Sequence, residues 1–234
     1  MILANVTPSE HLHHKEFINH NSDSNITQIK PFVLMCGLPE GVIDIDSVDN
    51  KTLLYDTTYA SSIHRSKRQQ ETRYQNANNS IIKNGNIGSQ TEITPKMRTT
   101  LMDWLLEVSD NHKCHVNTYH LAIQIMDHTL SLINVKRGTY QLLGCACLWL
   151  AAKLVELHAP QVENLVYAAE CCFDTDALIS CEQKLIKLFE YKPLMPTRYY
   201  FIMRYIKAGQ FTLIEENLAI YLIELSVYDI TFQK

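Results

Sequence analysis

The sequence predicts an all-α fold, and three observations support this prediction. Every side chain from Leu142 to Ala152 is apolar or small, which is typical of a helix at the centre of a bundle because no face is left for water. Further segments after residue 94 repeat their apolar residues at helical spacing. No segment predicts an internal strand. The central run is also too short to cross a bilayer, which needs about 20 apolar residues.

Composition excludes several classes of protein. The 234 residues carry a formal net charge of −4, which gives no bias toward nucleic acid or an anionic membrane. Seven cysteines, an odd number, do not predict a disulfide framework, so we expect a reducing compartment. The start of the chain lacks the basic region and long apolar core of a signal peptide. We therefore expect an intracellular protein with neither nucleic acid nor a membrane as a partner.

Residues 1–90 are rich in Asn, Ser, Thr and His, and we expect this region to be largely flexible. A short helix is predicted near residues 58–71, followed by a linker over residues 83–90. His11, His13 and His14 lie close together in the sequence, and histidine is a residue type that binds metals. Their spacing fits no usual zinc site and nothing nearby supplies further ligands, so no metal site is expected.

The first helix of the ordered region is predicted to begin at Thr94, as N-cap, and Pro95. Arg98 falls inside the apolar arc of this helix. Because a buried charge costs several kcal/mol unless it is paired, we favour a buried Arg98 with a dedicated carboxylate over one that reaches solvent. The apolar face consists of Met97, Leu101, Leu105 and Val108.

A second helix is predicted after Asn117, which we expect to be its N-cap. Asp127 borders the apolar arc of this helix. It is therefore the candidate partner of Arg98. The apolar residues of the second helix are Leu121, Ala122, Ile125, Met126, Leu130 and Ile133.

Three more helices complete this group. The central helix lies within Thr139–Leu157 and places Lys153 at the end of its apolar run. Pro160 starts the fourth helix, and the fifth spans Asp176–Tyr191 with Glu182 inside its apolar face. Charges on apolar faces indicate salt bridges or a partner surface rather than a face turned to solvent.

The motifs of common enzymes are missing from the sequence. It contains no Gly-rich phosphate loop, no HExxH, no CxxC and no GxSxG. We therefore expect a protein that is not an enzyme and that uses no cofactor.

Several segments resemble one known family. MRTTLMDWLLEV is similar to the start of the cyclin box, and YQLLGCACLWLAAKLVELHAPQVENLVY and CEQKLIKLFEY continue the likeness. A further resemblance, to the helical region that precedes the box in A- and B-type mitotic cyclins, is seen in IDIDSVDNKTLLYDTTYASSIHRSKRQQETR. The segment APQVENLVY is more similar to A-type than to B-type cyclins. The resemblance implies a five-helix cyclin box over residues 91–192. Residues 193–234 resemble the first two helices of a second cyclin fold, with helical patterns after Pro196 and over Glu215–Tyr228.

The resemblance implies a regulatory subunit that binds and activates a cyclin-dependent serine/threonine kinase in the cell cycle, in the nucleus and cytoplasm. Arg98 and Asp127 correspond to the internal salt bridge of the family. Lys153 and Glu182 correspond to the pair that contacts the kinase. Leu154 and Glu156 complete the expected kinase-binding residues.

The resemblance also implies a docking groove for RxL-type substrate or inhibitor peptides. Trp104 has an alternative interpretation as an ordinary core residue. The groove residues implied are Met97, Leu101, Trp104, Glu107 and Gln141.

The sequence departs from the family at several positions, and these departures keep two alternatives open. Leu154 and Val155 replace a usual aromatic residue and Glu, His158 and Ala159 replace an aromatic-Pro pair, and Thr100 replaces an apolar groove residue. The segment before the cyclin box contains no RxxL motif, which is the destruction signal typical of mitotic cyclins. One alternative is a binding module that does not activate a kinase, acting as a decoy or scaffold, which Leu154 and Val155 favour. The other is a cyclin-fold transcription factor, which the net charge of −4 disfavours.

Overall fold

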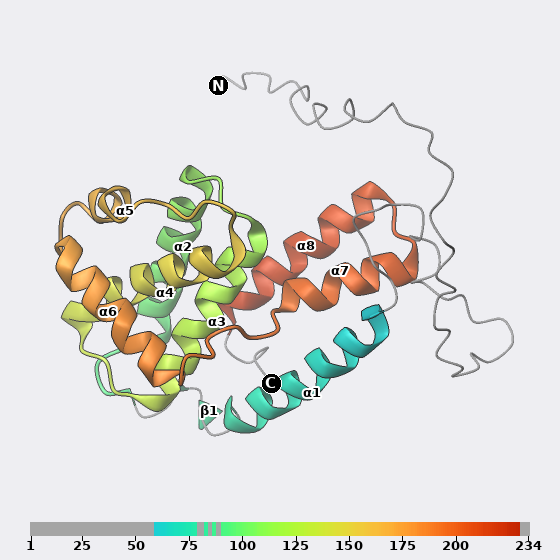
Figure 1. Cartoon of the computed structure of the whole chain (residues 1–234), viewed down its shortest axis with the longest axis horizontal. Coiled ribbons are helices and arrows are strands. Elements are labelled where there is room, and N and C mark those ends of the chain that lie inside the picture. Colours follow the sequence, from blue (N-terminus) through green and yellow to red (C-terminus); the bar gives the residue numbers. More distant parts are fainter. Residues whose placement is uncertain (1–58, 79–81, 84–85, 88–89, 230–234) are drawn as a thin grey trace, which may run out of the picture. The chain divides into compact units, whose positions relative to one another are not determined.

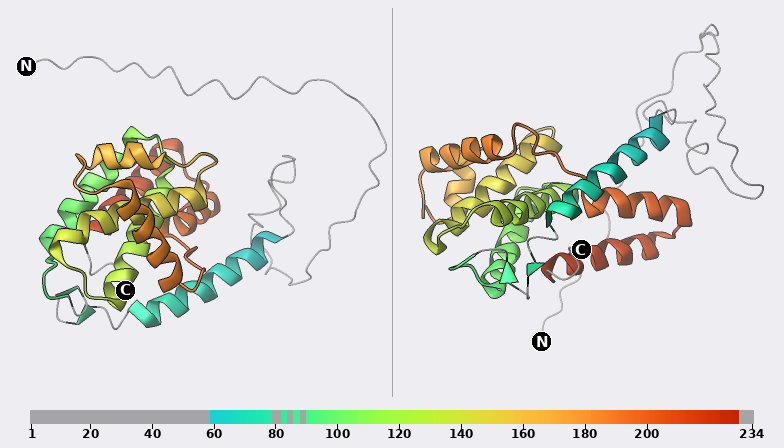
Figure 2. Two further views of the ribbon diagram at one scale, coloured as in Figure 1. Left: turned by 60° about the vertical axis from the view of Figure 1, so that its left-hand side comes forward. Right: turned by 90° about the horizontal axis from the view of Figure 1, so that it is seen from below.

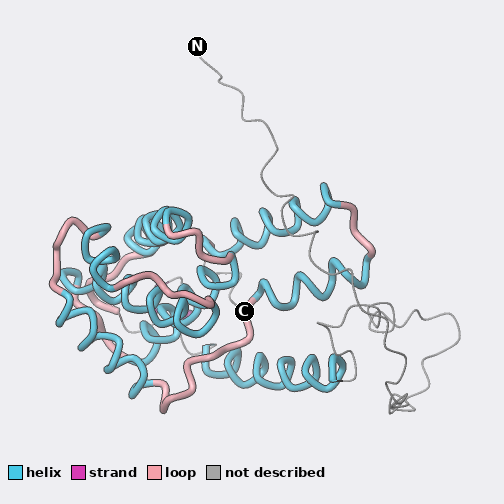
Figure 3. Tube along the Cα trace, turned by 45° about the horizontal axis from the view of Figure 1, so that its top comes forward, coloured by secondary structure: helices cyan, strands magenta, loops and turns pink. Residues whose placement is uncertain are grey.

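The computed structural model describes residues 59–78, 82–83, 86–87 and 90–229. Helices joined by short connections make up most of this part of the chain (Figure 3). The all-α prediction is therefore confirmed. The histidine cluster near the N-terminus and most of the segment before the predicted short helix lie outside the described residues.

Two features before the box differ from expectation. Helix α1 spans Ala60–Asn78, whereas the predicted helix ended near residue 71. Strands β1 (Ile82–Lys83) and β2 (Asn86–Ile87) pair antiparallel where a linker was expected, so the prediction that no strand is present was wrong. The sequence between the two strands is Asn-Gly, which is the strongest short signal for a hairpin turn.

Helix α2 (Pro95–Asn111) begins where the sequence predicts. The side chain of Thr94 accepts a hydrogen bond from the backbone N–H of Met97, and Pro95 occupies the first turn, where its missing N–H costs nothing.

Helix α3 (Val116–Leu132) begins at a different cap from the one expected. His115 is the N-cap, and its Nδ1 accepts a hydrogen bond 3.1 Å long from the backbone N–H of Asn117. The side-chain oxygen of Asn117 instead accepts a hydrogen bond from the Thr197 hydroxyl, just before α7. The predicted Asn117 cap was therefore wrong because a residue far along the chain engages that side chain.

Helix α4 (Tyr140–Val155) follows the short 3₁₀ turn η3 (Arg137–Thr139) and forms the centre of the box. All of its residues from Leu143 to Ala152 are buried, and it packs most extensively against α3 and α6 (Figure 1). Gly144 permits a close approach to α2, because a Cβ there would lie 2.9 Å from Cδ2 of Leu101. Among the described residues, Arg137–Val155 is long and apolar enough to cross a membrane by length and composition, but 61% of its apolar 18-residue window is buried inside the protein.

Helices α5 (Val162–Ala168) and α6 (Thr175–Leu188) cover further sides of α4. The side chain of Asp174 caps α6 by accepting a hydrogen bond from the backbone N–H of Ala177. Helix α6 ends before the predicted Tyr191. Glu190 and Tyr191 adopt left-handed φ values of 49° and 62°, which a continuing helix does not allow.

Helices α7 (Arg198–Gly209) and α8 (Leu213–Tyr228) lie side by side after the box (Figure 2). A capping box between Thr212 and Glu215 starts α8. The C-terminal end of α8 packs on the box, where Val227 is 2% exposed. The outer face of α8 carries large apolar side chains that are about half exposed or more: Leu213, Ile214, Leu218, Tyr221, Leu222 and Leu225.

Limited proteolysis is expected to cut between Lys192 and Gln210 before it cuts α4. The reason is that α7 and α8 bury less of their apolar surface than the box helices, and helices of this length are marginal without tertiary packing. Mass spectrometry of early tryptic fragments checks this order. Equal resistance of both regions would show that α7 and α8 unfold together with the box.

Candidate functional site

Lys153 and Glu182 form an ion pair between the C-terminal end of α4 and the middle of α6. Nζ of Lys153 lies 2.8 Å from each carboxylate oxygen of Glu182. The Glu182 side chain is 8% exposed, whereas that of Lys153 is 38% exposed. The pair therefore joins two helices while one of its members stays accessible to a partner.

The indole of Trp149 also contacts Lys153. Nζ of Lys153 lies 3.2 Å from the centre of the Trp149 ring, which is one helical turn earlier on α4. The indole N–H donates a hydrogen bond 3.0 Å long to the backbone carbonyl of Pro160. Sequence reasoning did not single out Trp149. The available signal was the spacing of four residues, which places an aromatic ring and a lysine on one face of a helix.

Leu154 and Glu156, the other two predicted kinase-binding residues, differ from each other in their surroundings. Leu154 is 40% exposed next to Lys153, and Leu157 just beyond it is 91% exposed. The carboxylate of Glu156 accepts hydrogen bonds from the backbone N–H of His115, at 2.7 Å, and from the hydroxyl of Thr118. Glu156 therefore holds the N-terminus of α3, where the helix dipole favours a negative charge.

Arg98 and Asp127 form a buried bidentate ion pair. Nε and Nη2 of Arg98 donate to the two Asp127 oxygens, each at 2.7 Å, and the side chains are 1% and 8% exposed. Nη1 also donates to the carbonyls of Val227 and Tyr228, at 3.1 and 3.3 Å. Burial opposes the charge of Arg98, but the Asp127 carboxylate outweighs it and the pKa of Arg98 is raised. The structure thus brings the two predicted partners together and adds the end of α8 to them.

The residues predicted for peptide docking lie on α2 and at the start of α4, two helices that pack against each other. Leu101 is buried, whereas Trp104 is only half-buried at the edge of the core. Glu107 is exposed. Met97 and Gln141 are half-buried. The geometry leaves part of this surface accessible and does not make Trp104 a fully enclosed core residue.

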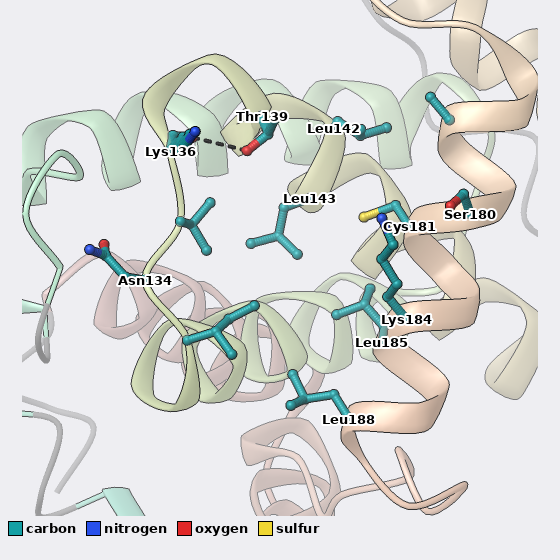
Figure 4. Close-up of a pocket in the computed structure, with 13 residues that line it drawn as sticks. Asn134, Lys136, Thr139, Leu142, Leu143, Ser180, Cys181, Lys184, Leu185 and Leu188 are labelled. Carbon is teal, nitrogen blue, oxygen red and sulfur yellow. Dashed lines mark hydrogen bonds between the residues drawn. The ribbon is translucent and has the colours of Figure 1, made fainter.

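A groove of about 660 Å³ lies between α6, the N-terminal end of α4 and the segment before it (Figure 4). It contains none of the residues predicted for peptide docking. Burial raises the pKa of the Cys181 thiol in its wall, although the nearby Lys184 lowers it in part, so the thiol is protonated near neutral pH. The apolar residues of the groove are Ile133, Val135, Leu142, Leu143, Leu185 and Leu188.

The part of the chain that the structure describes contains no group of three or more His, Cys, Asp or Glu side chains able to hold a metal ion. The described charged residues on apolar helix faces instead form two ion pairs, Arg98 with Asp127 and Lys153 with Glu182. The candidate site is therefore a surface formed by the C-terminal end of α4 and the middle of α6, with the Lys153–Glu182 ion pair between them.

Comparisons with known proteins identify the relatives of this chain. The family model described as "Cyclin, N-terminal domain" matches residues 63–192. Cyclin-A1 of Carassius auratus is 36% identical over 172 residues, which cover 74% of this chain and 42% of the relative. The G2/mitotic-specific cyclin-B of Hydra viridissima is 32% identical over 190 residues, covering 81% and 46%.

Other similarities agree with these. Cyclin-A1 of Homo sapiens is 31% identical over 201 residues, covering 86% of this chain and 42% of the relative. The X-ray structure of a viral cyclin from herpesvirus saimiri matches with a TM-score of 0.53 and 20% identity, covering 62% of this chain and 63% of that one. The chain spans less than half the length of the curated relatives it matches.

Proposed function

Because the chain belongs to the cyclin family and is of the A/B type, we propose that it binds and activates a cyclin-dependent serine/threonine kinase. The observation that carries this proposal is the pair of Lys153 and Glu182. The pair is ordered within the protein, yet Lys153 remains accessible beside the exposed Leu154 and Leu157. Exposed apolar side chains give a partner apolar area to bury, and the neighbouring charge can fix which partner binds and in which register.

The proposed mechanism uses binding energy alone. The C-terminal end of α4 and the middle of α6 contact the regulatory helix of the kinase and favour its active position. In that position the kinase completes its own Lys–Glu ion pair and orders its activation loop. A cyclin acts in this way only if it binds the active arrangement more tightly than the inactive one. The chain supplies contacts, and the kinase supplies the chemistry.

Calorimetric titration of the purified chain into a purified cyclin-dependent kinase tests the proposal. We expect a one-to-one complex at micromolar or tighter affinity. A panel of such kinases without any detectable complex would contradict the proposal.

A second candidate is a binding module that occupies the kinase without activating it. Two observations favour it: Leu154 and Val155 replace the usual aromatic and acidic residues, and the Glu156 carboxylate is already bound to α3. Complex formation without a gain in phosphorylation would identify this module.

We further propose that α2 and the start of α4 bind RxL-type peptides of substrates or inhibitors. The partly accessible indole of Trp104 and the exposed Glu107 support this proposal, because an RxL peptide presents an apolar side chain and a cation.

We also propose that the protein acts in the nucleus and cytoplasm.

Trp104→Ala is expected to abolish binding of RxL peptides and to leave kinase affinity near that of the wild type. The docking residues lie on α2 and the start of α4, whereas Lys153 lies at the other end of α4. Fluorescence anisotropy of a labelled RxL peptide and a kinase titration measure the two activities. If both fall together and circular dichroism shows unfolding, Trp104 is a core residue and the docking assignment fails.

A further inference from the structure

The ammonium group of Lys153 is held between two side chains of the same domain. Glu182 contacts it through both carboxylate oxygens, at 2.8 Å each, and the face of Trp149 lies 3.2 Å away. Trp149 is 8% exposed, so its ring is largely shielded from solvent. Positive charge over an indole face is the strongest form of the cation–π interaction available from aromatic side chains.

We propose that Trp149 is a positioning residue, which fixes the Lys153 ammonium in the place from which it contacts the kinase. This inference rests on the proposed function. The aromatic face and the Glu182 carboxylate both contact the Lys153 ammonium, although the Lys153 side chain is 38% exposed.

The need for such a residue follows from the properties of lysine. A lysine side chain has a long flexible stem, and an exposed ion pair restrains it only weakly. Each side chain that must be ordered when a partner binds reduces the affinity. A ring that already orders Lys153 in the free chain removes that cost before the kinase arrives.

The ring itself is fixed by its other edge. The indole N–H donates to the carbonyl of Pro160, in the connection that leads to the N-cap of α5 at Gln161. Trp149 therefore has two separable interactions: its face holds Lys153, and its N–H ties the connection between α4 and α5. Phenylalanine keeps an aromatic face but lacks the N–H, whereas leucine lacks both.

The first readout uses the free chain and needs no kinase. Protons above an aromatic ring shift upfield in NMR spectra, and the signal of the Lys153 side chain can be assigned by its loss in Lys153→Met. We expect upfield-shifted ε-methylene protons in the wild type, a retained shift in Trp149→Phe and an ordinary position in Trp149→Leu. An ordinary position in the wild type would overturn the inference.

The second readout is kinase affinity. Trp149→Leu is expected to weaken binding roughly fivefold to tenfold, and Trp149→Phe no more than about threefold. In the Lys153→Met background, Trp149→Leu should cause no further loss, because no ammonium is left to position. A further loss of equal size there, or wild-type affinity in Trp149→Leu, would overturn the inference.

Two controls keep these results separable. Trp104→Leu removes the other tryptophan and should leave the Lys153 signal unchanged. If Trp149→Leu does not fold, the wild-type NMR shift decides the question, because an ordinary position of the Lys153 ε-methylene protons overturns the inference by itself. If no kinase binds the wild type, the proposed function fails, whereas the NMR shift still shows whether the ring holds Lys153.

Discussion

Asp127→Ala is expected to lower the free energy of unfolding by about 3 kcal/mol. The Arg98 side chain is 1% exposed and donates to both Asp127 oxygens at 2.7 Å. Without the carboxylate, the guanidinium stays buried, and the acceptors left to it among the described residues are the carbonyls at the end of α8. Urea unfolding followed by circular dichroism measures the change.

A matched variant separates the charge from the packing. Replacing both partners, as Arg98→Met with Asp127→Ala, should be less destabilising than Asp127→Ala alone, because no unpaired charge is left buried. A loss below about 1 kcal/mol in Asp127→Ala would contradict this account of the pair, since that is the range of exposed ion pairs.

Lys153→Ala and Glu182→Ala are each expected to weaken kinase binding by about 2 kcal/mol or more, which is roughly 30-fold in Kd. Each change leaves the other member of the pair without its partner in an interface from which water is excluded. Titration calorimetry with the purified kinase measures the loss.

Lys184→Ala is the matched control for this pair. Lys184 lies on the same helix as Glu182 but lines the groove of Figure 4 and makes no ion pair in the described part of the chain. Its removal should leave the affinity unchanged. Wild-type affinity in both Lys153→Ala and Glu182→Ala would remove these residues from the interface.

The sequence predicts helices and buried ion pairs best where the pattern of apolar residues shows which side chains are buried. The run from Leu142 to Ala152 leaves no face for water, which is typical of a central helix, and α4 is buried from Leu143 to Ala152. Arg98 lies inside an apolar arc, so periodicity alone indicates a buried partner. The two carbonyls at the end of α8 were not predicted, because that contact joins residues 129 and 130 positions apart.

Local contacts decided by the tertiary fold were predicted less well. Asn117 has the chemistry of an N-cap, but Thr197 engages it and His115 caps α3 instead. Glu156 was expected to face a partner, and it binds the N-terminus of α3. In both cases the deciding neighbour lies at least 38 positions away in the chain, where sequence patterns give no distance.

A histone-kinase assay tests the central claim most directly, because it measures activation as well as binding. Purified kinase is assayed alone, with the wild-type chain, and with the variant Lys153→Ala at concentrations that saturate the wild-type complex. We predict that the wild-type chain raises the phosphorylation rate by orders of magnitude and that Lys153→Ala needs a much higher concentration to do so. A saturated wild-type complex with the rate of the kinase alone would contradict the claim and identify the chain as a binding module.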